Sequence, residues 1–291
     1  MLKRCVLLAL LGIAFAPLAA AAQGRPIGLA ERKGGRDHAL ELELDFSSIT
    51  IDPPLAAAEV TYTTLLPKLY GSFGLTETLE LEAQLTTIYA GYSPEGAEGD
   101  STFELANPYV ALFYAKRTDR SVARIGGGVA LPVLDAEGYG MAPFQGAATR
   151  GLMDMWLYVP EALSFVIPVQ LQVRATTLVL GVDAALALTI NTGEGDLEDD
   201  DDVEVPLQAG ALAGAALGDV TLGLRLQVAT LLTADGDNTQ VSALPFVQAD
   251  LDGGGFIHGG VLVNLDEPLG VLGDDNLFEV WAVRVGGGTR F

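Results

Sequence analysis

The sequence predicts an all-β chain that folds as a closed antiparallel up-and-down transmembrane β-barrel of about 12 strands. Three observations predict this fold. First, apolar and polar residues alternate with a period of two. Second, the connections between the alternating stretches are short and long in regular succession. Third, an apolar export signal precedes the first of these stretches. Such an alternation places one face of each strand against hydrocarbon and the other face against a polar lumen.

The alternation is clearest in residues 40–46, 79–85, 178–188 and 220–228, where leucine, valine, alanine or phenylalanine occupies every second position. An α-helix would distribute these apolar residues around its whole surface, so the pattern excludes helices. Division of the chain at clusters of turn-forming and charged residues gives the approximate strand spans 38–47, 59–73, 78–91, 103–116, 121–132, 161–174, 177–190, 203–216, 220–233, 240–251, 256–265 and 277–291.

The connections between these strands form two alternating sets. The long set is more acidic than the short set, as expected for a barrel with brief periplasmic turns and longer external loops. An even number of strands then places both ends of the barrel on the side of the short turns. The short connections are 74–77, 117–120, 175–176, 217–219 and 252–255, and the long ones are 48–58, 92–102, 133–160, 191–202, 234–239 and 266–276.

Residues 1–22 have the composition of a secretory signal peptide. Lys3 and Arg4 form its positively charged start, and residues 5–16 are apolar. Cys5 lies too early in the apolar run for a lipid anchor, and no cysteine remains for a disulfide after cleavage. The predicted organisation is a signal peptide (1–22), an N-terminal lead-in (23–37) and a β-barrel domain (38–291).

The charge of the chain restricts its partners. The formal net charge is −22 at pH 7, which argues against nucleic acid, since phosphates require lysine and arginine. The acidic excess attracts cations instead. Beyond the signal, no stretch stays apolar for the ~20 residues that a membrane-spanning helix requires. The sequence therefore predicts a membrane protein that spans with strands.

The C-terminal strand and one hairpin resemble those of a known class. Trp281 and the terminal Phe291 resemble the aromatic end that the barrel-assembly machinery of bacterial outer membranes recognises, and residues 74–81 are similar to the G-L-T-x-x-L-E-L hairpins of porin-like proteins. The chain thus resembles the bacterial outer-membrane β-barrels. The resemblance implies a location in the outer membrane, with lipid, lipopolysaccharide and the assembly machinery as partners.

Two features depart from this class. No aromatic residue occurs between Phe165 and Phe246, although aromatic girdles mark both interfaces of such barrels. Pro168, Pro206 and Pro245 fall within or near predicted strands, where each proline would remove a ladder hydrogen bond.

Charged residues on the inner face of the predicted strands would line a narrow lumen, which side chains partly fill at this strand number. The charges either pair and close the lumen, or leave an acid-lined path for small neutral or cationic solutes. The predicted lumen-lining residues are Glu41, Glu43, Asp45, Glu80, Glu82, Arg124, Arg174, Asp183, Glu204, Arg225 and Arg284.

The connection 133–160 is the longest, and long loops tend to be functional. It is expected to fold inward as a constriction or to cover the mouth of the barrel. Its aromatic and large apolar residues are Tyr139, Met141, Phe144, Trp156 and Tyr158.

The sequence predicts no enzyme. A nucleophilic serine site needs histidine as a base, and neither His38 nor His258 lies in a His-x-Ser pair. The absence of a mature cysteine and of a histidine cluster argues against zinc or iron. Glu80 and Glu82 lie two positions apart, or about 6–7 Å along a strand. That spacing suits glycosidic chemistry, but any polar lumen produces it by default.

One external connection is densely acidic. Crowded carboxylates repel one another unless cations neutralise them, and oxygen-rich clusters suit Ca²⁺ or Mg²⁺. The loop is either solvated or binds such ions, which could bridge it to lipopolysaccharide phosphates; no other cofactor is expected. The candidate ligands are Glu194, Asp196, Glu198, Asp199, Asp200, Asp201 and Asp202, with Asp235 and Asp237 as a second candidate.

Three functions remain open from the sequence. The first is a passive outer-membrane pore for small neutral or cationic solutes. The second is a closed structural or adhesive surface barrel that acts through its acidic loops. The third is a soluble exported β-protein that binds a ligand.

Overall fold

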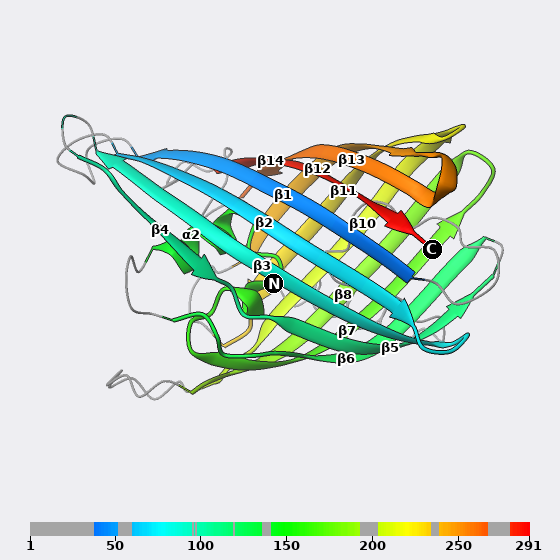
Figure 1. Cartoon of the computed structure of the whole chain (residues 1–291), viewed down its shortest axis with the longest axis horizontal. Coiled ribbons are helices and arrows are strands. Elements are labelled where there is room, and N and C mark those ends of the chain that lie inside the picture. The colour runs from blue at the N-terminus through cyan, green and yellow to red at the C-terminus, as the bar shows by residue number, and fades with distance from the viewer. Residues whose placement is uncertain are drawn as a thin grey trace, which may run out of the picture.

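A single sheet of long tilted strands closes into a barrel (Figure 1). The computed structural model describes residues 38–51, 60–94, 96, 98–118, 120–135, 141–192, 203–233, 239–266 and 280–291. The strands are β1 (His38–Ile51), β2 (Val60–Gly74), β3 (Leu79–Pro94), β4 (Asp100–Leu105), β5 (Tyr109–Arg117), β6 (Ser121–Ala130), β7 (Ala162–Arg174), β8 (Leu178–Asn191), β9 (Val203–Glu204), β10 (Pro206–Leu217), β11 (Val220–Leu231), β12 (Thr239–Asp250), β13 (Gly255–Asn264) and β14 (Trp281–Arg290). The helices are α2 (Ala142–Thr149), η1 (Met155–Leu157) and η2 (Asp252–Gly254).

Two sets of strand pairings close the sheet into a ring. β1 pairs with β14, and β10 pairs with both β11 and β8. β4 and β5 both pair with β3, and β9 and β10 both pair with β8, so each of these two couples fills one position. The result is a closed antiparallel barrel of 12 strand positions, which confirms the predicted fold class.

Several predicted strand spans differ in detail from the observed strands, and the span 203–216 is divided at Val205 into β9 and β10. The span 103–116 is divided into β4 and β5, because Asn107 and Pro108 leave the sheet between them. Pro108 has no backbone N–H to donate to a neighbouring strand. β1 does not end at residue 47 but continues to Ile51, paired throughout with β2.

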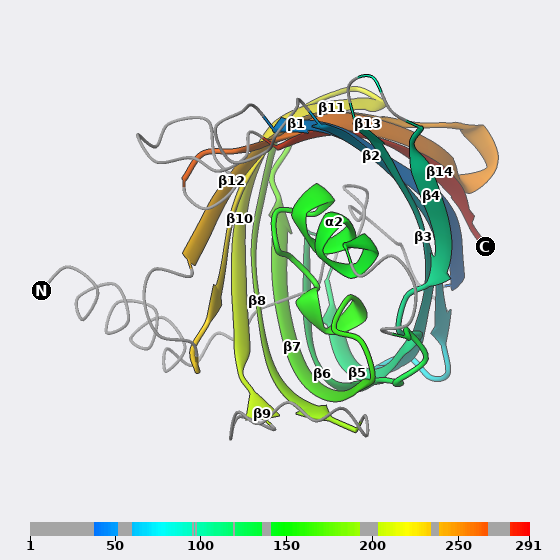
Figure 2. The ribbon, with the colours of Figure 1, turned by 90° about the vertical axis from the view of Figure 1, so that its left-hand side faces the viewer.

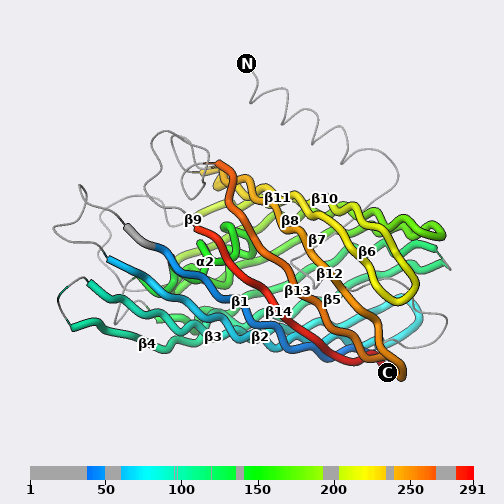
Figure 3. The backbone as a smooth tube through the Cα atoms, turned by 90° about the horizontal axis from the view of Figure 1, so that it is seen from above, coloured from blue at the N-terminus to red at the C-terminus, as the bar shows by residue number. Residues whose placement is uncertain are grey.

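Both ends of the barrel domain lie at the same rim, as the even strand number predicts. The backbone N–H of His38 donates to the carbonyl of Phe291 (3.1 Å), and the N–H of Phe291 donates back to His38 (3.0 Å). The short turns after β2, β5, β7, β10 and β12 lie at this rim, here called the short-turn rim. The opposite rim, here called the long-loop rim, is where β1 and β3 end and β2 begins (Figure 3). The predicted signal peptide and lead-in lie outside the described residues.

The outer surface of the wall is apolar. On β11, Leu222, Leu224 and Leu226 are 42–48% exposed, whereas the alternate residues Arg225 and Gln227 are buried inside. Within the described residues, no second sheet covers these leucines, because all the strands there belong to one ring. The apolar faces therefore meet hydrocarbon, and a soluble β-protein is excluded. In the described part of the chain, no helix has the length and hydropathy to cross a membrane.

The prolines interrupt the ladder without opening the ring. Pairing of β6 with β7 stops between Ile125 and Gly128, opposite Pro168. Pairing of β12 with β13 stops opposite Pro245 in the same way, and Pro206 is the first residue of β10. The lipid-facing surface of β8, β10 and β11 consists of aliphatic side chains alone, as the absence of aromatic residues there predicts.

A charge in the lipid-facing surface is expected to destabilise the barrel according to its depth. Leu224→Arg lies in the middle of β11 and should lower the free energy of unfolding by about 2–4 kcal/mol. Leu217→Arg, at the short-turn end of β10, should cost about 0–1 kcal/mol and is the matched control. Urea unfolding in phospholipid vesicles measures both values, and equal costs at the two sites would contradict the membrane assignment.

Candidate functional site

The connection between β6 and β7 folds into the barrel. Figure 2, which looks into the ring of strands, shows α2 inside it. This connection, here called the inner segment, comprises residues 131–161, of which 136–140 lie outside the described residues. Trp156 and Tyr158 are buried in it, and Met141 and Phe144 are half-buried. The expected inward fold is therefore observed, while Tyr139 is not among the described residues.

The base of the inner segment packs by apolar contact. Trp156, Leu157 and Tyr158 form a cluster with small or branched side chains of the wall, including Ile88 on β3 and Val166 on β7. A Cβ atom at position 146 would lie 2.7 Å from the Tyr158 ring, so only glycine allows α2 to lie this close. These contacts bury the aromatic face of the segment against one side of the barrel, which runs from β3 to β8.

Asn107 fastens both ends of the inner segment. Its side-chain carbonyl accepts from the backbone N–H groups of Val133 (3.0 Å) and Leu134 (2.9 Å). Its amide donates to the carbonyls of Trp156 (3.3 Å) and Val159 (2.7 Å). One buried side chain thus joins the start and the end of the segment to the break between β4 and β5. The sequence analysis missed Asn107.

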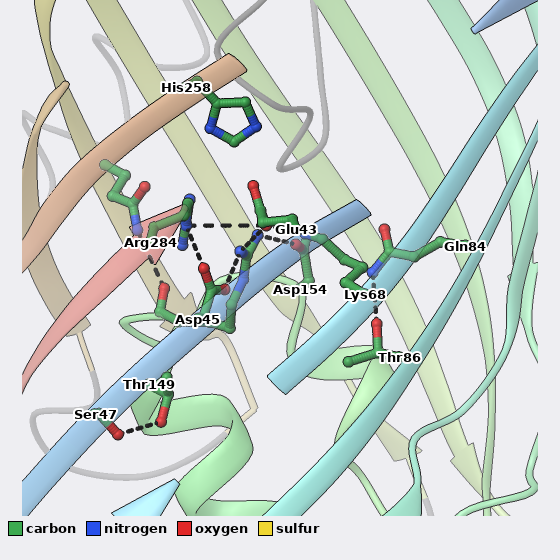
Figure 4. Close-up of polar contacts among 12 residues, drawn as sticks. Glu43, Asp45, Ser47, Lys68, Gln84, Thr86, Thr149, Asp154, His258 and Arg284 are labelled. Carbon is green, nitrogen blue, oxygen red and sulfur yellow. Dashed lines mark hydrogen bonds and ion pairs between the residues drawn. The ribbon is translucent and has the colours of Figure 1, made fainter. Parts of the chain in front are cut away.

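The tip of the inner segment, residues 149–154, reaches β1 through polar contacts. The hydroxyl groups of Thr149 and Ser47 are 2.6 Å apart. Arg150 Nη1 lies 2.8 Å from Glu43 Oε1 and 2.6 Å from Asp45 Oδ2, and Arg150 Nη2 lies 3.1 Å from Asp154 Oδ2. Glu43, Asp45 and Asp154 meet in the lumen in Figure 4.

The same tip also reaches the far wall. Gln208 on β10 donates to Asp154 Oδ1 (3.2 Å) and accepts from the Asp154 N–H (2.6 Å). Gln227 on β11 donates to the carbonyl of Arg150 (3.2 Å). A Cβ at Gly151 would lie 2.5 Å from the Ser242 hydroxyl on β12. The tip therefore spans the lumen from β1 to β10–β12.

The backbone of the tip is strained. Gly151, Leu152 and Asp154 have φ of 66°, 58° and 59°, in the left-handed region. For each of the two residues other than glycine, this conformation costs about 1–3 kcal/mol. Such a turn persists only where its surroundings hold it, and here the side-chain contacts of Arg150 and Asp154 do so.

The electrostatics of the inner segment favour the charged form of the tip. Burial opposes ionisation of Asp154, but neighbouring Arg150 outweighs it and lowers the pKa of the carboxyl group. Burial likewise opposes the charge on Arg150, but Asp45, Glu43 and Asp154 raise the pKa of its guanidinium group. Burial raises the pKa of the Tyr158 hydroxyl, so it stays neutral.

The structure places the predicted lumen-lining residues as follows. Glu41, Glu43, Asp45, Glu80, Glu82, Arg124, Asp183, Arg225 and Arg284 are buried on the inner face, whereas Arg174 and Glu204 are half-buried near the ends of β7 and β9. Most of them are paired: Arg124 contacts Glu80 (2.9 Å) and Glu82 (2.5 Å), and Arg225 contacts Asp183. The carboxylates Glu80 and Glu82 therefore share one guanidinium group.

One trio of buried residues has the spacing of metal ligands. Glu41, Glu43 and His258 have ligand atoms within 4.8 Å of one another. Lys68 Nζ and Arg150 Nη1 each lie 2.8 Å from Glu43 Oε1, and these cations would repel a bound metal ion. We therefore interpret the trio as part of the ion-pair network, with His258 Nε2 2.7 Å from Glu41 Oε1. The candidate metal ligands 194–202 and both candidates in 235–237 lie outside the described residues.

Water does not reach the wall around the inner segment. Inner side chains at this level are at most 5% exposed on every side: Ser47, Thr64, Ile88, Tyr109, Ala130, Val166, Ala187, Gln208, Gln227, Ser242 and Asn264. A lumen filled with water would expose these residues. In the described residues, the inner segment therefore fills this level of the barrel.

Trp281 and Phe291, the predicted assembly signal, lie on the outer surface. Trp281 begins β14 and is 43% exposed, and Phe291 is 67% exposed at the short-turn rim. The Phe291 ring lies 5.5 Å from the His38 ring at the seam between β14 and β1. Recognition by the assembly machinery stays a prediction.

The comparisons with known proteins identify a fold. No family model matches the chain, and no curated protein matches it. Among solved structures, it is similar to an outer-membrane channel from Pseudomonas putida F1, with a TM-score of 0.55, 10% identity, and coverage of 92% of this chain and 99% of that one. It is also similar to the NanC porin, with a TM-score of 0.51, 11% identity, and coverage of 86% and 98%. At these identities the likeness concerns the barrel fold.

Proposed function

We propose that this outer-membrane β-barrel is a passive channel for small neutral or cationic solutes, closed by its inner segment in the conformation described above. The observation that carries the proposal is the polar inner face of β1 and β10–β13 beside the tip. Ser47, Gln208, Gln227, Ser242 and Asn264 face the tip there. Side chains of this kind form the surface of a pathway once water enters.

An interior that is permanently filled by the inner segment would be expected to have a more apolar composition than the one observed beside the tip. Buried polar groups contribute little net stability and are costly when unpaired, so a structural core is usually apolar. The base of the inner segment meets this expectation, whereas the tip does not. Among the described residues, the inner face beside the tip has two apolar patches, one formed by Leu244, Phe246 and Leu262 and the other by Ile49 and Val280, against which Leu152 packs.

The charges of the lumen support a preference for cations. In the described residues, seven carboxylates are buried but only five lysine or arginine side chains are. An acidic excess in a narrow lumen favours cations over anions. The carboxylates are Glu41, Glu43, Asp45, Glu80, Glu82, Asp154 and Asp183, and the cationic side chains are Lys68, Arg124, Arg150, Arg225 and Arg284.

A closed structural barrel is the second candidate function. The exclusion of water around the inner segment favours it, because such a barrel needs no path. The two functions differ in what removal of the inner segment does. A channel then conducts ions through its polar lumen, whereas a barrel that depends on the segment as its core does not fold.

Deletion of the inner segment tests the proposal. Replacement of residues 141–158 by a short Gly-Ser linker should give discrete, cation-selective current steps in planar lipid bilayers, and the full-length chain should be mostly closed. The control carries the same linker in place of residues 234–238 and should conduct like the full-length chain. A deletion variant that folds, as judged by heat-modifiable gel mobility, but passes no current would exclude the channel.

A further inference from the structure

We infer that Arg150 is the positioning residue of a reversible latch, which holds the tip across the lumen and releases it while the base stays bound. The inference rests on the proposed channel function and concerns its regulation. It is carried by the way in which the charges divide between the tip and the wall.

The two wall carboxylates that meet the tip have cationic partners on the wall, and the tip carboxylate has a cationic partner on the tip. On the wall, Lys68 Nζ lies 2.8 Å from Glu43 Oε1, and Arg284 Nε lies 2.8 Å from Asp45 Oδ1. On the tip, Arg150 pairs with Asp154 at 3.1 Å. When the tip leaves, Glu43 and Asp45 keep Lys68 and Arg284, and Arg150 keeps Asp154. Figure 4 shows Lys68 and Arg284 on either side of the two β1 carboxylates.

Because each charged group keeps a partner, release of the tip from the wall costs little free energy. Breaking a buried ion pair is strongly destabilising when it leaves a charge without a partner. Here separation leaves no such charge, and water can solvate the polar groups on both surfaces. Arg124 is different, because its contacts with Glu80 and Glu82 lie wholly within the wall and would not separate when the inner segment moves.

The base and the tip are held by different chemistry. Trp156 and Leu157 pack in the apolar cluster, and Asn107 joins the two ends of the segment to the wall. The tip is held mainly by hydrogen bonds and ion pairs, with Leu152 packed against apolar residues that include Ile49 and Val280, and its left-handed residues Leu152 and Asp154 would relax on release. The tip is therefore the part that moves, and the route opens between it and the polar face of β10–β12 and β1.

Two substitutions with opposite effects test the latch. Arg150→Gln removes the guanidinium that bridges tip and wall, so the open probability in planar bilayers should rise about tenfold or more. Lys68→Met leaves Arg150 (2.8 Å) as the nearest cation to Glu43, with Arg284 farther away at 3.9 Å, so the open probability should fall below that of the unmodified chain. Arg150→Lys should give an intermediate value, since one ammonium replaces a forked contact only in part.

Arg290→Gln is the matched control. It removes an arginine that contacts Asp250 (3.1 Å) near the short-turn rim, away from the inner segment. Its open probability should equal that of the unmodified chain. A purely structural role for the network predicts instead that Arg150→Gln and Lys68→Met both increase leakage, and that result would overturn the latch.

A disulfide provides a second, independent test. The hydroxyl groups of Ser47 and Thr149 are 2.6 Å apart, which brings their Cβ atoms within reach of a disulfide. The only natural cysteine, Cys5, lies in the predicted signal peptide. The variant Ser47→Cys/Thr149→Cys should be silent when oxidised and should recover its openings when reduced. Openings of full size in the oxidised form would show that the tip does not move.

These outcomes separate the latch from the channel. If the deletion variant conducts but Arg150→Gln and the oxidised disulfide variant behave like the unmodified chain, the latch is wrong and the channel stands. If the folded deletion variant is silent, the channel itself is wrong.

Discussion

Replacement of Arg124 by alanine should lower the free energy of unfolding by about 3–5 kcal/mol, because it removes the ion-pair partner of buried Glu82 and leaves Glu80 with Arg117 alone. Arg124 Nε contacts Glu80 at 2.9 Å and its Nη2 contacts Glu82 at 2.5 Å, while its guanidinium also lies over the Phe113 ring. Urea unfolding in phospholipid vesicles, followed by tryptophan fluorescence, measures the loss.

Two further variants separate the causes. Arg290→Ala removes an arginine pair that is partly exposed at the short-turn rim and should cost about 0–1 kcal/mol. The double change Arg124→Met and Glu82→Gln removes both charges of one pair, keeps Glu80 paired with Arg117, and should recover most of the lost stability. An Arg124→Ala cost no larger than that of Arg290→Ala would contradict the buried network.

Replacement of Asn107 by alanine should release the inner segment from the wall and leave the channel permanently leaky. The change deprives the N–H group of Leu134 and the carbonyls of Trp156 and Val159 of a buried partner, whereas the N–H of Val133 also donates to the carbonyl of Leu131 (2.9 Å). Each unsatisfied group costs about 1–3 kcal/mol. Steady bilayer current and protease cleavage within residues 131–161 measure the release.

The control for Asn107 is another buried amide. Gln240 on β12 donates to the carbonyls of Val241 and Asp266 and does not fasten the inner segment. Gln240→Ala should leave the current and the protease resistance unchanged. If Asn107→Ala behaves like Gln240→Ala, the apolar base alone holds the segment.

The barrel could be predicted because the local sequence of each strand distinguishes the residues that face lipid from those that face the lumen. Leu222, Leu224 and Leu226 face lipid and alternate with polar residues, so a window of a few residues is sufficient. The same rule identified Glu43 and Asp45 as inner residues. It could not divide β4 from β5, because that break depends on what Asn107 binds far away in the sequence.

The residues of the site were harder to predict, since their roles are tertiary. Arg150 lies in an irregular connection with no periodicity, and 107 residues separate it from Glu43. Lys68 follows Pro67 in a strand, and nothing in its local sequence indicates a buried partner. A signal was present for the segment as a whole, whose length and aromatic residues predicted that it would either fold inward or cover the mouth of the barrel.

The contacts of the inner segment also constrain the order in which the protein matures. Arg150 and Asp154 find their partners on β1, near the start of the barrel, and on β10 and β11, well after the segment in the chain. An unfinished ring cannot present both surfaces at once, so these charges remain hydrated until the first and last strands meet. The tip therefore docks only after the ring is complete. In an intermediate arrested before β1 pairs with β14, the inner segment is accessible to periplasmic proteases.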